Sequence, residues 1–421
     1  MAQAVPARLD AHFGVGDAPV VHDAPALSPA AVTGDIRLTV YENLSAIEQD
    51  WRAFEPHADC TVFQSFDWLA TWQRLIGARN GVQPAIVVGR DASGSILFVL
   101  PLAVRSAGFA RKLTWLGTEL CDYNAPLLSA AFSARIDAKR FMALWENIAK
   151  CLQDNTRLHF DFIDLEKMPE TVGAQQNPMR HLGGTITPSG AYLTHLAGDW
   201  ETFYAAKRSS STRRRDRTKR KKLAEFGELK LINPDGDREI LHTLDTLMAQ
   251  KTRSFSRMGV GNLFAKPGYA EFYRALATDP ATRHLVHVSR LDVGATAAAV
   301  NLGLTYRDCY YHLLASYDDG DVSRFGPGAA HLQELLHQAI DRGFRIFDFT
   351  IGDEGYKRDW CDTEIKLYDY VSAATWRGAL VAMPMLAARR LKRWIKQTPM
   401  LWSAFSAGRA LIGSMARGFR R

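Results

Sequence analysis

The 421-residue sequence contains few cysteines, and their spacing argues against the sites that cysteine clusters build. There is no Cys-x-x-Cys pair, and no cysteine lies near histidines at the spacing of metal ligands. We therefore expect no metal site and no disulfide framework, but reduced and mostly buried thiols in a cytoplasmic protein. The five residues are Cys60, Cys121, Cys151, Cys309 and Cys361.

The sequence also lacks long apolar runs, and its C-terminal end lacks acidic residues. The longest nearly uncharged apolar stretch, Ala379 to Ala388, falls well short of the ~20 residues of a spanning helix. Residues 1–35 lack the basic-then-apolar layout of a secretory signal, so we expect a disordered tail there. Residues 373–421 hold ten Lys or Arg and no Asp or Glu, so the formal charge of +7 becomes −3 without them. This segment predicts a basic helical tail.

The remaining length is enough for two domains, each with its own core. Both halves alternate strand-like and helix-like patterns, which predicts an α+β fold with mixed, mostly antiparallel sheets flanked by helices. We place the first domain at residues 36–190 and the second at 191–372, because glycines and a proline cluster near residue 190. Three strands in series, ending with Cys309 to Ser316, indicate a meander in the second half, and strands at Arg345 to Phe349 and Ile365 to Val371 close it. No residue-level internal repeat is evident.

The junction after Ser316 is a candidate phosphate site. A polar loop leads to Gly326-Pro327-Gly328-Ala329, which opens an apolar-faced helix. Glycines let a ligand approach the backbone, and the free N–H groups at a helix start favour phosphate oxygens. Arg324 adds a charged donor. The alternative is an ordinary tight loop that caps a helix.

Asp348 lies inside the apolar strand Phe347-Asp348-Phe349, where a carboxylate is costly to desolvate unless it is paired or used. It is a candidate general base or orienter of an acceptor amine, or else a buried cap for the loop at Gly352. His312 is a second candidate base, or a satisfied strand histidine. Tyr356 and Lys357 either hold ligand oxygens or form the surface of a short helix.

The order of these motifs resembles the CelD-like acetyltransferase family, GNAT relatives associated with cellulose and exopolysaccharide synthesis. The motifs are the Gly-Pro-Gly helix, Phe-Asp-Phe, and Gly-Asp-Glu-x-Tyr-Lys-x-x-Trp ending at Trp360. The likeness is strongest over residues 210–371 and extends weakly to Gln64–Trp68, Leu116-Gly117 and Asp122-Tyr123. The chain is more distantly similar to FemAB-type transferases, which pair two GNAT-like domains and use the second for the donor.

The resemblance implies two tandem GNAT-like domains and direct acyl transfer from acetyl-CoA or another acyl-CoA. The thioester would lie between splayed strands, with a backbone N–H near Leu313 or Leu314 stabilising the oxyanion. The resemblance assigns base catalysis to Asp348 or His312. It assigns donor binding to Arg324, Gly326, Pro327, Gly328 and Ala329. The acceptor side would comprise Asp122, Tyr123, Tyr356, Lys357 and Trp360. Pro327 departs from the usual GNAT phosphate loop, which leaves open which amides touch the pyrophosphate.

We expect the acceptor to be an amine or hydroxyl of a sugar, polysaccharide or envelope precursor. The alternatives are FemAB-like transfer of an aminoacyl group from tRNA, or a non-catalytic membrane-recruited or nucleic-acid-binding scaffold. Ten Lys or Arg between Lys207 and Lys222 form a solvated helix face, a grip for phosphates of coenzyme A or a sugar nucleotide, or a nucleic-acid patch. The lack of interleaved aromatic residues argues against nucleic acid.

The C-terminal tail offers a further expectation about location. Apolar residues from Leu401 to Phe419 recur at helical spacing, with arginines on another side. Such a helix in residues 376–421 binds the anionic inner face of a membrane peripherally, or packs on the protein body.

Overall fold

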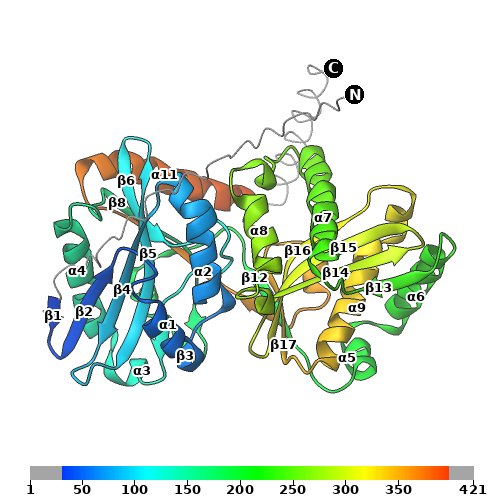
Figure 1. The fold of residues 1–421 in the computed structure, drawn as a ribbon, viewed down its shortest axis with the longest axis horizontal. Coiled ribbons are helices and arrows are strands. Elements are labelled where there is room, and N and C mark those ends of the chain that lie inside the picture. Colours follow the sequence, from blue (N-terminus) through cyan, green and yellow to red (C-terminus); the bar gives the residue numbers. More distant parts are fainter. Residues whose placement is uncertain (1–30, 398–421) are drawn as a thin grey trace, which may run out of the picture.

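The computed structural model describes residues 31–397 as two sheets side by side, each flanked by helices (Figure 1). This arrangement confirms the expected α+β fold with mixed, mostly antiparallel sheets. Residues 31–33, which we expected to belong to a disordered tail, instead form a strand paired with β2. The apolar spacing predicted from Leu401 to Phe419 lies outside the described residues.

The first sheet has ten strands, eight of them in the order β1-β2-β4-β5-β6-β8-β19-β11. Most of its strands come from the first half of the chain and are covered by α4 on one face and α1 and α2 on the other (Figure 1). Its strands are β1 (Ala31–Thr33), β2 (Ile36–Tyr41), β3 (Ala58–Asp59), β4 (Gln83–Arg90), β5 (Ile96–Ala107), β6 (Ala110–Trp115), β7 (Leu127–Ser129), β8 (Phe162–Pro169), β11 (Thr185–Ile186) and β19 (Leu367–Ala373). The helices around it are α1 (Glu48–Phe54), α2 (Phe66–Trp72), α3 (Phe132–Arg135), α4 (Ala138–Asp154) and α11 (Trp376–Gln397).

The second sheet has seven strands in the order β13-β14-β15-β16-β17-β12-β18. They are β12 (Ala191–His195), β13 (Leu229–Ile232), β14 (Val286–Val293), β15 (Thr296–Tyr306), β16 (Cys309–Tyr317), β17 (Ile346–Ile351) and β18 (Thr363–Ile365). Its helices are α5 (Trp200–Lys207), α6 (Ser210–Ala224), α7 (Asp237–Met258), α8 (Tyr269–Thr278), α9 (Pro327–Asp341) and α10 (Gly355–Arg358). A separate small sheet pairs β9 (Thr171–Val172) with β10 (Gln175–Gln176).

Local sequence accounts for most of these elements. Helix α9 begins with Pro327 at its first position, where no N–H is needed, and buries Leu332, Leu335 and Leu336 on one face. The meander β14–β16 has tight turns, one of which places Gly294 at a φ of 60°. No helix between residues 31 and 397 is long and apolar enough to cross a membrane.

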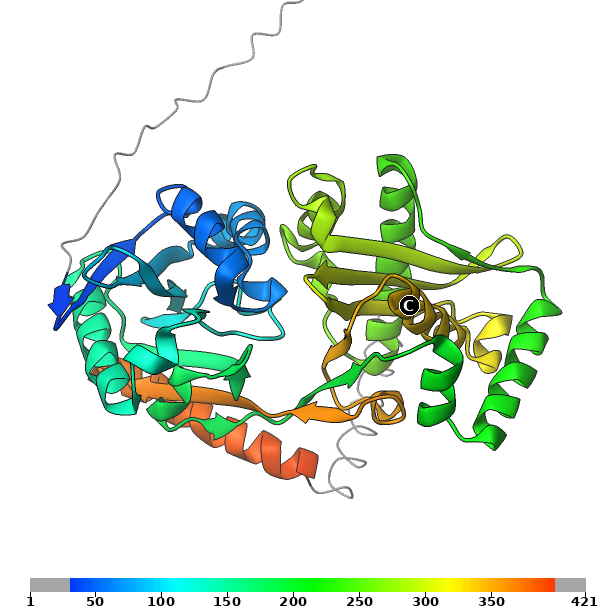
Figure 2. The same cartoon turned by 90° about the horizontal axis from the view of Figure 1, so that it is seen from below.

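Each sheet receives the strand that follows the other sheet's strands in the chain, so the two halves exchange one strand each. Strand β12 follows the first half in sequence but pairs with β17, and β19 follows the second half but pairs with β8. Figure 2 shows β19, in orange, running along the first sheet while β12, in green, crosses to the other side. We expected the strand near Ile365 to Val371 to close the second sheet, and this placement was wrong. A strand pattern identifies a strand but not the sheet edge that it joins.

Because of this exchange, the two sheets share one topology. Starting from β2 in the first sheet and from β13 in the second, three antiparallel pairs lead to a parallel pair, β6 with β8 and β16 with β17. The exchanged strand and a short outer strand then follow, both antiparallel. The fold therefore contains a structural repeat that the sequence does not show at the level of residues.

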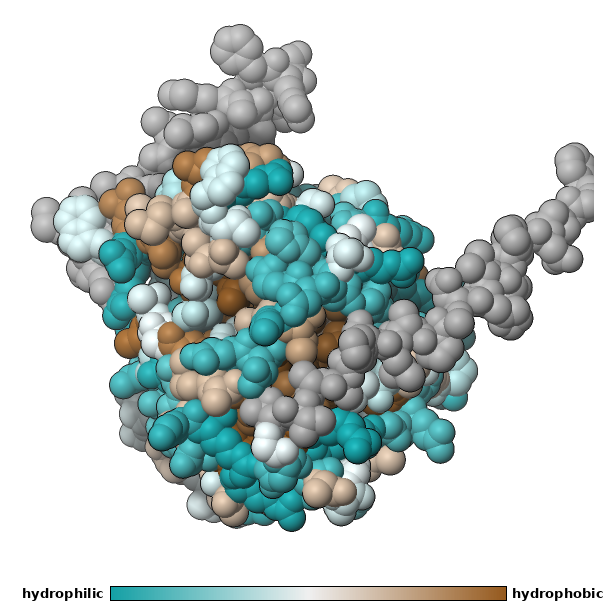
Figure 3. Space-filling model, turned by 90° about the vertical axis from the view of Figure 1, so that its left-hand side faces the viewer, coloured by the Kyte–Doolittle hydropathy of each residue, from teal (hydrophilic) through white to brown (hydrophobic). Residues whose placement is uncertain are grey.

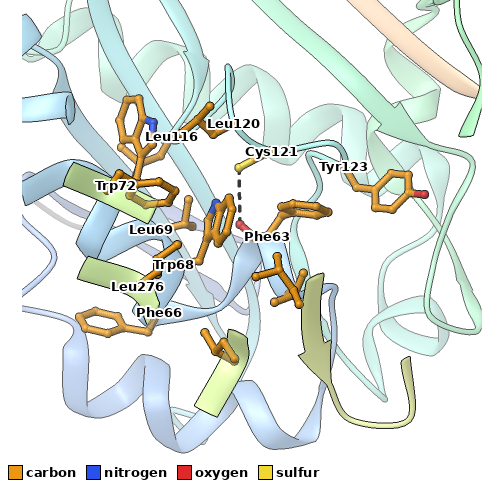
Figure 4. Packing of buried hydrophobic residues seen from close by; sticks show 14 of the residues in the cluster. Phe63, Phe66, Trp68, Leu69, Trp72, Leu116, Leu120, Cys121, Tyr123 and Leu276 are labelled. Atoms are coloured by element: carbon orange, nitrogen blue, oxygen red, sulfur yellow. Dashed lines mark hydrogen bonds between the residues drawn. The ribbon is translucent and has the colours of Figure 1, made fainter. Parts of the chain in front are cut away.

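One hydrophobic cluster joins the halves. Trp68 on α2 is fully buried, and its ring meets Phe272 on α8 edge to face at a centroid distance of 5.0 Å. Figure 4 shows Trp68, Leu69 and Trp72 of the first half packed beside Leu276 of α8. The two halves therefore have a continuous core and should unfold together.

Replacing Trp68 with alanine tests this continuity. We expect Trp68→Ala to lower the free energy of unfolding by about 3–5 kcal/mol, because a large buried ring leaves a cavity. Trp376→Ala is the matched control, since this ring is 74% exposed, and should change stability by less than about 0.5 kcal/mol. Denaturant titration gives both values. Two separate transitions, with only one shifted by Trp68→Ala, would contradict a shared core.

Candidate active site

The parallel strands β16 and β17 separate after a short paired stretch. Their register joins Cys309, Tyr310 and Tyr311 to Ile346, Phe347 and Asp348. Beyond these pairs β16 continues along β15, whereas β17 continues along β12. The separation expected for an acyl donor therefore begins at Asp348.

A β-bulge lies on β16 at the same point. Leu302 pairs with Leu314 and Leu304 pairs with Tyr311, so two steps along β15 correspond to three steps along β16. A bulge leaves a residue out of the ladder and turns its backbone groups away from the neighbouring strand. Leu313 and Leu314, the candidates for an oxyanion-binding amide, lie at this bulge and are half-buried.

Asp348 is buried and held by residues of both halves. The Tyr123 hydroxyl, from the first half, lies 2.8 Å from Oδ1 and 2.9 Å from Oδ2, and the Thr350 N–H donates to Oδ1 at 2.7 Å. Burial raises the pKa of Asp348 to about 7, and the hydrogen bonds from Tyr123 and Thr350 limit that rise. Figure 4 shows the Tyr123 hydroxyl turned away from the Trp68 cluster. The carboxyl can therefore give up or take a proton near neutral pH.

Thr350 has an unusual backbone conformation that serves this contact. Its φ of 59° lies in the left-handed region, which is costly for a β-branched residue. The bend turns its N–H back toward Asp348 two residues earlier. Sequence reasoning missed Thr350, because no glycine or asparagine signals a positive φ at this position.

Further charged groups surround the loop after β17. Asp122 is half-buried; burial raises its pKa, opposed by the charge of Lys167 and a hydrogen bond from the Thr350 side chain. Lys357 is buried, donates to the Ile351 carbonyl at 2.9 Å, and pairs with Glu354 at 3.0 Å. It is therefore not a surface residue of a short helix. Burial also lowers the pKa of Lys251, which sequence reasoning did not single out.

The other candidate side chains lie in different surroundings. His312 packs against Phe347, and burial lowers its pKa to about 3, which makes it a weak base. Trp360 is buried and stacked in an aromatic cluster with Trp200, Phe203 and Tyr204, and its expected place on the acceptor side stays a prediction. Tyr356 is 40% exposed.

The turn before α9 is accessible to solvent. Ala329 and Arg324 are exposed, and Gly326 and Gly328 are half-buried. Gly326 has a φ of 70°, which only glycine adopts readily. The Gly326 N–H donates to Ser323, Pro327 has none, and the Ala329 N–H donates to the Gly326 carbonyl at 3.1 Å. Among the described hydrogen bonds of this turn, the amide of Gly328 is the one left for a ligand.

The basic helix α6 lies against this turn. The Lys219 Nζ is 4.0 Å from the position that a Cβ on Gly326 would take, and Leu223 packs with Val322 and Ala330. Arg213, Arg217 and Arg220 line a cavity of about 230 Å³ between α5, α6 and α9. The sequence marked the whole segment as basic, but only the fold shows that Lys219 adjoins Gly326.

Comparison with known families decides the nature of the second half. Residues 210–358 match the family model described as the acetyltransferase (GNAT) domain. This segment is therefore similar to a GNAT acetyltransferase domain. The model covers α6 through α10, and so includes both Asp348 and the Gly326 turn. No curated protein sequence matches the chain.

The chain is similar to several solved structures at low sequence identity. The crystal structure of FemX is 10% identical, with 77% of this chain and 96% of that chain covered and a TM-score of 0.53. A tandem GNAT protein from the clavulanic acid biosynthesis pathway is 12% identical, covers 80% and 98%, and has a TM-score of 0.43. L-PGS from Bacillus licheniformis is 11% identical, covers 80% and 95%, and has a TM-score of 0.46. The FemX likeness shows that the two proteins share a fold over most of this chain.

Proposed function

We propose that this protein transfers an acyl group, acetyl in the simplest case, from coenzyme A to an amine or hydroxyl. The observation that carries the proposal is Asp348, a buried carboxyl with a pKa of about 7, placed where β16 and β17 separate in the GNAT domain. Perturbed groups of this kind, matched to neutral pH, are typical of general bases.

The donor fits the turn before α9. The Gly328 N–H, at the start of a fifteen-residue helix, would donate to a diphosphate oxygen of the donor. Lys219, next to Gly326, and exposed Arg324 supply positive charge near this turn. The position of Lys219 supports the interpretation of the basic segment as a grip for coenzyme A phosphates.

The chemistry requires one proton transfer and one carbonyl addition. The acceptor nitrogen or oxygen forms a bond to the thioester carbon, Asp348 takes the acceptor proton, and the carbon–sulfur bond then breaks to release the thiolate of coenzyme A. The thiolate takes up a proton as Asp348 gives its own back to the sulfur or to solvent. An amide at the β16 bulge, from Leu313 or Leu314, would stabilise the oxyanion, an effect of about 3–4 kcal/mol in other enzymes. Tyr123 holds the Asp348 carboxylate in place. His312, with its low pKa, is less suited to this role.

The acceptor we propose is a sugar, polysaccharide or envelope precursor, supported by the CelD-like order of motifs. Asp122 and Tyr123 of the first half adjoin Asp348, so the first half would shape the acceptor side. We also propose peripheral association with anionic membrane through residues 376–421, supported by their ten basic residues and lack of acidic ones.

A ligand panel tests the function as a whole. Acetyl-CoA should raise the melting temperature, since a ligand at 100 times its Kd stabilises a protein by about 2.7 kcal/mol. Thiol release from acetyl-CoA should then depend on one of the added amino sugars, sugars, amino acids or polyamines. Absence of both effects, together with salt-sensitive binding of tRNA, would instead favour the FemAB-like alternative.

Replacing Gly328 with valine tests the donor assignment. A Cβ at this position would lie 3.4 Å from the Tyr317 ring, so the branched side chain crowds the approach to the amide without a backbone clash. We expect the affinity for acetyl-CoA to fall at least about tenfold, with the unliganded protein still folded. Gly261→Val is the control, because a Cβ at Gly261 meets nothing within 4 Å. Equal calorimetric affinities in both variants would contradict the donor site.

A further inference from the structure

Helix α11 is packed on the protein body by one face. The backbone of Gly378 approaches so closely that a Cβ there would lie 1.8 Å from the Asp161 carbonyl oxygen. Ala382 is buried in a cluster with Ala110 and Phe162, and the Arg389 guanidinium meets Asp164 of β8 at 2.8 Å. This side of the helix is therefore fixed against the first sheet.

The opposite face of α11 carries an apolar stripe. Its members are Trp376, Leu380, Met383, Leu391 and Trp394, and their side chains are 55–74% exposed. They recur every three or four residues, with Ala387 filling the one longer gap. At 3.6 residues per turn they therefore lie within an arc of about 80°. Seven other large apolar side chains among the described residues are exposed, and one of them, Phe109, belongs to a residue whose carbonyl accepts a hydrogen bond from Arg377 of α11. Exposed stripes of this kind mark interaction surfaces.

Figure 3 views the molecule from the left-hand side of Figure 1. Most of the visible face is hydrophilic, and brown and tan side chains gather at its upper left. Helix α11 runs along that side of the first sheet in Figures 1 and 2. Because its side chains are 55–74% exposed, the stripe is part of the outer surface and is not buried between the two halves.

We propose that the exposed face of α11, the stripe defined above, lies on an anionic membrane surface. Two tryptophans on a helix face suit the boundary between headgroups and acyl chains, because their rings are apolar and carry one polar N–H. Exposed Arg390 is adjacent in sequence to Leu391 of the stripe, and residues 373–421 contain no acidic residue to repel phosphate headgroups. A protein partner would instead have to offer acidic groups around an apolar groove.

This inference deepens the proposed peripheral location, but it is independent of acyl transfer. It assigns the contact to residues 376–394, whereas the sequence pointed to residues 401–419. Because α11 is fixed to the first sheet, binding would hold the whole protein in one orientation on the membrane, not on a loose tether.

Vesicle flotation tests the assignment. The full chain should float with vesicles of phosphatidylglycerol and phosphatidylcholine, and much less with phosphatidylcholine alone. For the double variant Trp376→Ala/Trp394→Ala, the fraction of protein bound to vesicles should fall at least tenfold. The matched control Phe226→Ala/Met258→Ala, which removes two exposed apolar side chains outside α11, should bind like the parent. Circular dichroism checks that each variant is folded.

A chain that ends at Gln397 separates α11 from the segment that follows it. We expect this truncated chain to keep most of the binding. The inference is overturned if truncation removes binding while the double tryptophan variant retains it, or if neutral vesicles bind the parent equally well. Acetyl-CoA should raise the melting temperature of the double tryptophan variant as it does for the parent, so loss of flotation leaves the acyl-transfer proposal standing.

Discussion

Asp348→Asn should reduce acyl transfer by a factor of about 10² to 10⁴ while leaving acetyl-CoA binding intact. Asparagine matches the shape of the carboxyl group and can still accept the hydrogen bonds of Tyr123 and Thr350, but it cannot take the acceptor proton. Thiol release measured at saturating acetyl-CoA gives the rate, and calorimetry gives the affinity. Asp341→Asn, at an exposed position at the end of α9, serves as the control.

The pH dependence of the parent follows from the same carboxyl. With a pKa of about 7, Asp348 is protonated in acid, so activity should rise with pH and level off above about pH 8. Tyr123→Phe removes a hydrogen bond that lowers this pKa, so it should move the midpoint of the profile upward. A profile unchanged by Tyr123→Phe would show that another group sets it.

Stability should change in the opposite sense to activity. Because the folded-state pKa of Asp348 is raised from its ordinary 3.8, its contribution is fully present below about pH 4 and is lost as pH rises through about 7. Three pKa units correspond to about 4 kcal/mol, an upper limit for the gain of Asp348→Asn at pH 8. Denaturant titrations should therefore show a larger stability gain at pH 8 than at pH 5. A variant that loses both activity and stability at pH 8 would indicate misfolding rather than a lost base.

Splitting the chain at the exposed loop after Gly198 should yield two fragments that fold only together. Residues 1–198 would carry β12, which the second sheet needs, and residues 199–421 would carry β19, which the first sheet needs. Each fragment alone leaves an unpaired strand edge and exposes buried residues such as Leu367, so we expect aggregation.

Co-expression with a tag on one fragment measures the effect. We expect a one-to-one complex that binds acetyl-CoA, and insoluble protein when either fragment is made alone. A soluble 199–421 fragment with a cooperative melting transition would contradict the structural need for exchange. A split in the exposed turn at Gly94 is the control, because it separates adjacent strands of one hairpin, β4 and β5, and breaks no exchange.

Features fixed by short stretches of sequence were predictable. Pro327 and its flanking glycines indicated the start of α9, and the polar turns of the meander indicated its strands. Asp348 was a candidate because a carboxylate in an apolar strand needs a partner. The identity of that partner was not predictable, since Tyr123 lies 225 residues away and reaches it only through the packing of the two halves.

Two placements show where local patterns lose information. The Trp360 ring stacks in the cluster of Trp200 and Tyr204, which no spacing rule connects to it. Likewise, the residues of β19 were predicted to form a strand of the second sheet. The sequence pattern does not show which sheet edge a strand joins, because edge pairing depends on tertiary contacts. The free energy that decides both placements comes from distant side chains.

The exchanged strands also determine when the first sheet can be completed during synthesis. Strand β8 leaves the ribosome about two hundred residues before β19, which at 5–20 residues per second is a delay of roughly 10–40 s. During that interval the nascent chain presents an open β-edge that neighbouring chains on the same messenger can join. Translation speed and chaperone capture should therefore govern the yield of this protein more than the stability of the finished fold.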